Sequence, residues 1–196
     1  MHPYQLTREA FAAAVASMDP TTLVPACPDW TVHQLLAHQV HQLRGALDGS
    51  FPLDAALSRV SGSDITERLD AAARQQAWIT RGVQELSVVG VGELLEVWAD
   101  LCHSAPPSVR DALVPDVVVH LFDLFGVIGS HAYRQHDIVV VALNFWADVA
   151  GEPIPDDWSA RFELLRAITG RRSRDQAPNL NHEVAVYGWR SEPLIE

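Results

Sequence analysis

The stretch "VPDVVVHLFDLFGVIG", residues Val114 to Gly129, is almost wholly apolar, but Asp116, His120 and Asp123 interrupt it. A helix that is apolar on all sides normally lies at the centre of a helical protein. At about 100° per residue, the three polar side chains fall on one narrow stripe of such a helix. Unpaired carboxylates would be costly there, so the stripe requires a cation, a hydrogen-bonding partner or water.

Two interpretations of this stripe are open. A carboxylate and an imidazole at positions i and i+4, such as Asp116 and His120, can both reach one metal ion, as the corresponding pair does in helical zinc sites. The alternative is a solvated groove, or a buried histidine paired with an aspartate. From this helix alone the alternative is favoured, and a third ligand would change the balance.

A second amphipathic helix is predicted from "TVHQLLAHQVHQLRGALDG", where Thr31 and Gln34 form a capping box. On its helical wheel His33 and His41 face outward. His38 lies at the edge of the apolar stripe among polar or small neighbours, which suits a cavity better than dense packing. His38 is therefore the best candidate for a third ligand, and the alternative is a surface histidine that borders the core.

Apolar periodicity and helix stop signals predict further helices along the chain. They cover residues 4–18, 68–86 after a capping box at Asp64 and Glu67, 92–103, 115–129, 137–151 and 158–170, the last with Gly170 as its stop. Residues 182–196 alternate in polarity and favour a strand or hairpin. The predicted fold is mainly α: an antiparallel four-helix bundle over residues 1–151 with a small helical or α+β extension, residues 152–196, packed on it.

Composition limits the classes of function. The chain has 196 residues, 48% of them hydrophobic, which suits one globular domain with a small appendage. Its apolar runs are too short to span a bilayer and its N-terminus lacks a signal core, so we expect a soluble, cytoplasmic protein with no membrane partner. A net charge of −11 would repel nucleic acid. Cys27 and Cys102 do not form a disulfide framework, which indicates a reducing compartment.

The chain contains one basic cluster, formed by Arg171, Arg172 and Arg174. Arginine forks recognise carboxylates, so Arg171 and Arg172 are candidates for binding a cofactor or an acidic substrate. The competing interpretation, which the sequence favours, is a solvated helix terminus that the helix dipole stabilises.

Three segments together resemble a known family. "CPDWTVHQLLAHQ" resembles the signature of DinB-like four-helix bundles, in which a tryptophan opens the helix and a histidine eight residues later binds metal; Trp30 and His38 have this spacing. "PDVVVHLFDLFGVIG" is similar to the "E-x-x-x-H-x-x-D-L" segment of the mycothiol-dependent maleylpyruvate isomerase family. "LLRAITGRRSRDQ" is similar to a C-terminal motif of some actinobacterial members. Three segments in the right order are more specific than any one alone.

The resemblance implies that His38, Asp116 and His120 bind a divalent metal, most readily zinc. Family members usually have Glu at the position of Asp116. Since Asp is one methylene shorter, its carboxylate reaches the metal only if the helices approach more closely or a water intervenes. Asp123 would orient a ligand through a hydrogen bond, or cap a neighbouring helix, rather than bind the metal itself.

The implied chemistry is that of a thiol. Two imidazoles and one carboxylate leave open positions at which the cofactor mycothiol can bind and lose its proton. The resemblance therefore favours a monomeric or homodimeric isomerase or S-transferase that acts on a small electrophilic or unsaturated acid. The alternative is a non-enzymatic DinB-like module that binds metal or a small ligand in stress response or regulation. In either case Cys27 is expected to belong to a loop signature rather than act as nucleophile, and Cys102 to pack in the core.

Overall fold

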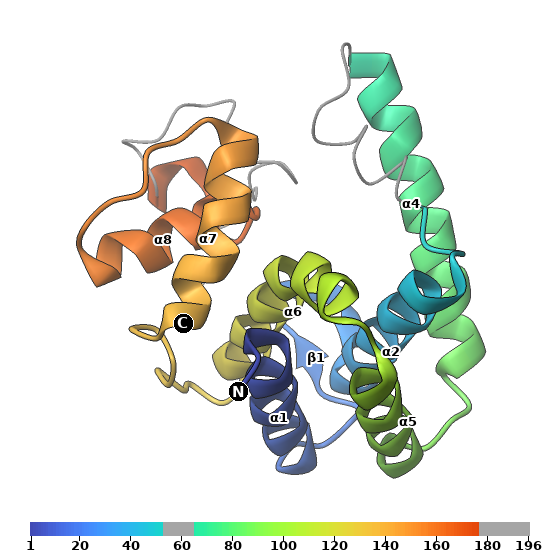
Figure 1. Ribbon diagram of the computed structural model, residues 1–196. Coiled ribbons are helices and arrows are strands. Elements are labelled where there is room, and N and C mark those ends of the chain that lie inside the picture. Colours follow the sequence, from blue (N-terminus) through green and yellow to red (C-terminus); the bar gives the residue numbers. More distant parts are fainter. Residues whose placement is uncertain (53–64, 177–196) are drawn as a thin grey trace. The chain divides into compact units, whose positions relative to one another are not determined.

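The computed structural model of the protein describes residues 1–52 and 65–176 (Figure 1). Within this part of the chain the fold is mainly α, as predicted. The helices are α1 (Pro3–Ala16), α2 (Val32–Asp48), α4 (Ile65–Leu86), α5 (Val91–Ser104), α6 (Pro107–Val127), α7 (Asp137–Ala150) and α8 (Trp158–Ile168). The short strands β1 (Leu23–Val24) and β2 (Cys27–Thr31) pair with each other, and a 3-10 turn, η1, covers Arg174–Gln176.

The chain divides into two compact units that alternate along the sequence. Among the described residues, the first unit contains 1–17, 23–29 and 113–176, and the second contains 18–22, 30–52 and 65–112. The expected boundary at residue 151 falls inside the first unit, because α7 and α8, on either side of it, pack against each other.

The helix α6 begins at Pro107, so the prediction that it starts at Pro115 was wrong. Pro107 occupies the first turn, where the missing backbone N–H of a proline costs no hydrogen bond. Pro115 lies inside the helix and removes one bond of its backbone ladder. Its carbonyl oxygen accepts a hydrogen bond of 3.2 Å from the Trp146 indole, which links α6 to α7 within the first unit.

The core of the first unit explains why α6 is apolar on nearly all sides. From Val117 to Phe125 every residue of the helix is buried. The ring of Phe122 meets the ring of Phe162 of α8 edge to face, with centroids 4.8 Å apart. The next residue of α6, Asp123, is bound by Arg171 from the turn that follows α8.

In the second unit, α2 packs against both α4 and α5. Its capping box, Thr31 with Gln34, is confirmed. The prediction that His33 and His41 face outward was wrong, since both are only partly exposed. The ring of His41 lies 3.8 Å from that of Trp78 in α4, and His33 Nε2 lies 2.8 Å from the carbonyl oxygen of Val89. The tryptophan ring and the backbone carbonyl belong to other segments of the chain, so the helical wheel of α2 alone cannot predict these contacts.

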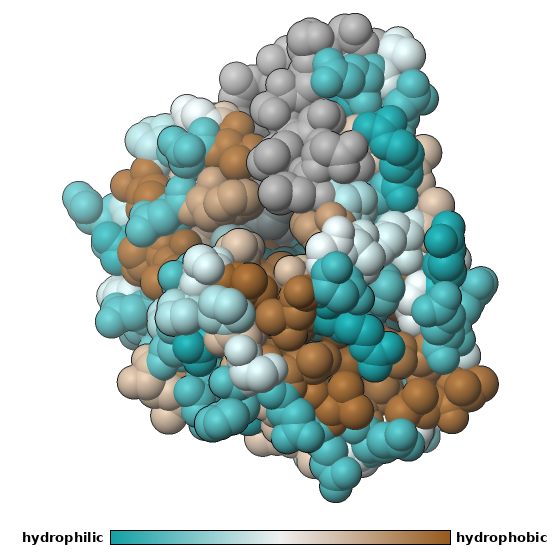
Figure 2. All heavy atoms as spheres, turned by 45° about the vertical axis from the view of Figure 1, so that its right-hand side comes forward, coloured by the Kyte–Doolittle hydropathy of each residue, from teal (hydrophilic) through white to brown (hydrophobic). Residues whose placement is uncertain are grey.

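The other helix predictions are confirmed to within two residues at each end for α1, α5, α7 and α8. The predicted capping box at Asp64 and the predicted strand or hairpin at 182–196 lie outside the described residues. Within the described ranges, no helix combines the length and apolarity that crossing a membrane requires. Hydrophilic side chains are spread over the face shown in Figure 2, interspersed with apolar ones.

Candidate functional site

The polar stripe of α6 is confirmed, and His120 is its centre. His120 Nδ1 lies 2.9 Å from Asp123 Oδ2, and His120 Nε2 lies 3.7 Å from Asp116 Oδ1. The spacings i, i+4 and i, i+3 bring both carboxylates to one imidazole because the helix turns once in 3.6 residues. The two carboxylates face opposite ring nitrogens, so the two sides of the imidazole have different neighbours.

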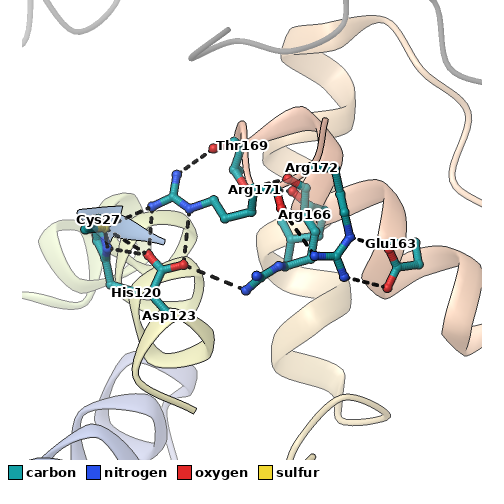
Figure 3. A network of polar contacts seen from close by, with 9 residues as sticks. Cys27, His120, Asp123, Glu163, Arg166, Thr169, Arg171 and Arg172 are labelled. Atoms are coloured by element: carbon teal, nitrogen blue, oxygen red, sulfur yellow. Dashed lines mark hydrogen bonds and ion pairs between the residues drawn. The ribbon is translucent and has the colours of Figure 1, made fainter. Parts of the chain in front are cut away.

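Asp123 is the buried anchor of the stripe, with a side chain that is 0% exposed. Arg171 binds both of its oxygens: Nη2 donates to Oδ2 at 2.8 Å and Nε donates to Oδ1 at 3.2 Å (Figure 3). Arg166 Nη1 lies at ion-pair distance, 3.8 Å, from Oδ1. A buried carboxylate is tolerated only when it is paired and hydrogen-bonded, and Asp123 meets both conditions.

Arg171 reaches Asp123 because of the way in which α8 ends. Gly170 adopts a left-handed conformation, φ +74°, which an L side chain rarely accepts. The N–H of Gly170 bonds the carbonyl of Ala167, and the N–H of Arg171 bonds the carbonyl of Arg166, the pair of bonds that defines a Schellman motif. The prediction that Gly170 stops this helix is confirmed, and the turn directs the chain so that Arg171 meets α6.

Cys27 joins this network from strand β2, as Figure 3 shows. Its Sγ lies 3.5 Å from Asp123 Oδ2, 3.9 Å from His120 Nδ1 and 3.9 Å from Arg171 Nη2. Sequence reasoning placed Cys27 in a loop signature and missed these contacts. The periodicity of one helix cannot connect residues 93 and 144 positions apart, so no signal in the sequence identified them. Cys102 is buried, as predicted, and neither cysteine is part of a disulfide.

The interpretation of Arg171 and Arg172 as a solvated helix terminus was wrong. Their exposed fractions are 9% and 7%. Arg172, which follows the end of α8, binds both carboxylate oxygens of Glu163 within that helix, with distances of 2.7 Å and 3.0 Å. Each guanidinium thus holds a carboxylate of the protein itself. The binding of a cofactor by these two residues stays a prediction, and the side chain of Arg174 lies outside the described part.

The network shifts the proton affinities of its members. Burial by itself would lower the pKa of His120, but the charge of Asp116 and the contacts with Asp123 and Cys27 outweigh it and raise the pKa to about 10. Burial would raise the pKa of Asp123, but the charge and hydrogen bonds of Arg171 and His120 hold it well below the usual range of a carboxyl. Without a metal, a charged His120 therefore faces a charged Asp123 near neutral pH.

Within the first unit, ligand atoms of Cys27, His120 and Asp123 lie within 4.8 Å of one another, so this group could hold a metal ion. The contacts already present make it a poor fit, because Arg171 occupies both oxygens of Asp123 and would repel a cation. His120 Nε2 and Asp116 suit a metal better. An imidazole that donates Nδ1–H to a carboxylate presents its other nitrogen to a metal, which is the usual arrangement of histidine ligands.

The third predicted ligand, His38, belongs to α2 in the second unit, where it is buried and its ring lies 4.9 Å from that of Trp30. The tryptophan that opens the helix and the histidine eight residues later are thus neighbours. Because the predicted ligand set takes residues from both units, its convergence on one ion stays a prediction. Comparison of the chain with protein-family models, with curated proteins and with solved structures finds no match.

Proposed function

We propose that the protein is a metal- and thiol-dependent enzyme whose metal is held by His120 and Asp116 of α6, with His38 as the third ligand. The hydrogen bond from His120 Nδ1 to Asp123 carries the metal part of this proposal, because it leaves Nε2 on the side of the Asp116 carboxylate. The position of His38 in the ligand set rests on the sequence alone. The DinB-like four-helix bundle of the resembled family is part of the same proposal.

The surroundings of Asp116 are compatible with a ligand site that small molecules can enter. Its side chain is 25% exposed, whereas that of Asp123 is 0% exposed, so Asp116 is the more accessible of the two carboxylates beside His120. A divalent ion on the Asp116 side would replace the proton that His120 otherwise carries, and it would lower the pKa of a bound thiol to near neutrality. The hydrogen bond between His120 and Asp123 keeps the imidazole ring oriented whether or not a metal is bound.

The substrate class comes from the resemblance. A thiolate supplied by mycothiol adds to an unsaturated acid, the former double bond rotates, and the thiolate then leaves with its electron pair to restore the double bond. In an S-transferase the thiolate instead displaces a leaving group from an electrophile. Cys27 is not the proposed nucleophile, since its thiol contacts the carboxylate of Asp123 on the buried side of the ring.

One observation favours the alternative, a non-enzymatic DinB-like module. Asp116 and Asp123 together raise the pKa of His120 to about 10, so the charged imidazole satisfies both carboxylates without any metal. In that case the shorter Asp116 marks a site that has lost its catalytic ion and holds a small ligand or none.

Metal binding tests the first part of the proposal. We expect elemental analysis of protein purified without chelators to find a divalent metal, and zinc titration calorimetry to show weaker binding in Asp116→Asn, His120→Gln and His38→Ala. His131→Gln, an exposed histidine in the loop after α6, is the matched control and should bind as the parent does. If the parent binds no divalent ion, or if Asp116→Asn binds as tightly as the control, the metal proposal fails.

The direction in which Asp116→Asn changes thermal stability tests the metal proposal independently. If Asp116 is a ligand, Asp116→Asn should lower the thermal stability mainly of the metal-loaded protein. If the site is vestigial, the change removes a charge without a cation, and stability should stay level or rise.

Thiol dependence then separates the enzyme from the module. Metal-loaded protein is incubated with mycothiol and a panel of unsaturated acids and other electrophiles, and products are followed by mass spectrometry. Turnover that requires the thiol and disappears in His38→Ala supports the enzyme. Metal binding without any turnover would favour the module.

A further inference from the structure

We infer that Arg171 is a positioning residue of this site: it holds the Asp123 carboxylate in the orientation that accepts the Nδ1 proton of His120, and so directs Nε2 of His120 toward Asp116. The inference deepens the proposed function in one respect, since the directed nitrogen is the proposed metal ligand. It extends the site from α6 to the turn that ends α8.

The Asp123 carboxylate is bound through both of its oxygens. Asp123 Oδ2 lies 2.9 Å from His120 Nδ1 and 2.8 Å from Arg171 Nη2, so one oxygen serves both residues. The second oxygen, Oδ1, accepts from Arg171 Nε at 3.2 Å. Two parallel hydrogen bonds from a planar guanidinium fix the plane of a carboxylate, which a single contact cannot do.

The guanidinium of Arg171 is itself held in place. Its third nitrogen, Nη1, donates to the backbone carbonyl of Thr169 at 2.5 Å. Thr169 is in turn held by its hydroxyl, which donates to the Leu165 carbonyl at 2.7 Å. All three guanidinium nitrogens of Arg171 are therefore engaged. The side chain is therefore fixed to the backbone at the end of α8 and is not a mobile surface group.

The other nearby arginine, Arg166, does not orient the carboxylate in this way. Arg166 Nη1 lies 3.8 Å from Oδ1, too far for a hydrogen bond, and Oδ1 is the oxygen that His120 does not use. Arg166 contributes charge near Asp123, whereas Arg171 binds the oxygen that orients the imidazole. The geometry assigns orientation to Arg171 alone of these two.

The neighbouring residue provides a matched control. Arg172 follows Arg171, is equally buried, and binds both oxygens of a carboxylate, that of Glu163. Neither Arg172 nor Glu163 contacts Asp123 or His120 through any of these bonds. Arg172 also donates from Nη1 to the backbone carbonyl of Arg171 at 3.2 Å, so a change at Arg172 reports the cost of losing a similar ion pair and this backbone contact while the side chain of Arg171 keeps its bonds to Asp123.

The test compares Arg171→Lys and Arg171→Gln with Arg172→Lys and Arg172→Gln in the full chain. The first readout is the ring Nδ1–H of His120 in metal-free, ¹⁵N-histidine-labelled protein, assigned with His120→Gln. We expect a slowly exchanging, hydrogen-bonded signal in the parent and in both Arg172 variants. It should broaden or vanish in both Arg171 variants, because lysine retains the charge but cannot bind two oxygens at once.

The second readout is zinc affinity by calorimetry. Loss of the partner that orients a metal-binding histidine typically costs about 10- to 100-fold in affinity. We expect a loss of about 10-fold in Arg171→Lys, a larger loss in Arg171→Gln, and the parent affinity in the Arg172 variants. If the parent binds no zinc, the proposed function fails while the Nδ1–H measurement still decides the role of Arg171.

An unchanged Nδ1–H signal in a folded Arg171 variant overturns the inference, as does an equal loss of signal in the Arg172 variants. Arg171→Lys keeps the charge and is the variant expected to fold if Arg171→Gln does not, with circular dichroism as the check. Absence of a hydrogen-bonded Nδ1–H signal in the parent protein would overturn the inference without any variant.

Discussion

Arg171 and Arg172 are adjacent and each binds both oxygens of one carboxylate, but the two pairs lie in different surroundings. Arg171 reaches 48 positions back to Asp123, whose side chain is 0% exposed. Arg172 reaches 9 positions back to Glu163 of the preceding helix, α8, and the side chain of Glu163 is 47% exposed. The Arg171–Asp123 pair therefore connects two segments that are distant in sequence, in the core, whereas the Arg172–Glu163 pair stabilises one helix end locally. Depth of burial, more than the type of bond, should set what each pair contributes.

The largest expected effect comes from removal of each carboxylate in turn. Asp123→Ala leaves Arg171 buried without its partner and should lower the free energy of unfolding by about 3–5 kcal/mol. Glu163→Ala should lower it by about 1 kcal/mol or less, because water replaces a half-exposed carboxylate. Urea denaturation of the metal-free proteins measures both values. Equal losses would show that burial does not distinguish the two pairs.

Acid should affect the buried pair more than the exposed one. Arg171 and Arg172 lower the pKa values of Asp123 and Glu163 in the folded protein, against the opposing effect of burial. Each carboxylate therefore adds stability that is fully present above its unfolded-state pKa, about 4, and this stability is lost as the pH falls from that value toward the lower folded-state pKa. We expect the Glu163→Gln protein to lose nearly as much stability on acidification as the parent does, and the Asp123→Asn protein to lose less. Unfolding midpoints measured between neutral and acidic pH test this. The reverse order would contradict the comparison.

A smaller effect is expected at the turn that presents both arginines. Gly170→Ala places a side chain at φ +74° and should lower the free energy of unfolding by about 1–2 kcal/mol. Because the turn directs Arg171 toward α6, the His120 Nδ1–H signal should also weaken. As a control, Gly92→Ala in α5, where nothing lies within 4 Å of the added methyl group, should not destabilise the protein. An unperturbed signal in Gly170→Ala would mean that Arg171 finds Asp123 without this turn.

Salt should produce the smallest difference. At about 1 M salt the screening length falls to about 3 Å, so the interaction of a half-exposed pair weakens more than that of a buried one. The difference in stability between the parent and Glu163→Gln should shrink by about a few tenths of a kcal/mol, whereas the difference between the parent and Asp123→Asn should hardly change. Denaturation at low and high sodium chloride tests this, and equal salt dependence would argue against the comparison.

The helices themselves were largely predictable, because their signals are local. The capping box at Thr31 and Gln34, the stop at Gly170 and the polar stripe of α6 each depend on residues within a few turns of one another. The start of α6 was not predictable in this way. Pro115 is compatible with a first turn as well as with the inside of a helix, and only packing against Trp146 and the rest of the core shows which occurs.

For the site, the sequence by itself determined that Asp116, His120 and Asp123 share one stripe, since the period of a helix leaves no other arrangement. Only the tertiary structure decided which partners meet that stripe. The sequence favoured a solvated terminus for Arg171 and a loop for Cys27, because the contacts of these two residues with Asp123 join segments 48 and 96 positions apart. Such contacts arise when an apolar helix must bury a carboxylate and the fold brings a guanidinium to it. That requirement can be read from the sequence, but the residue that meets it depends on the packing of α8 against α6.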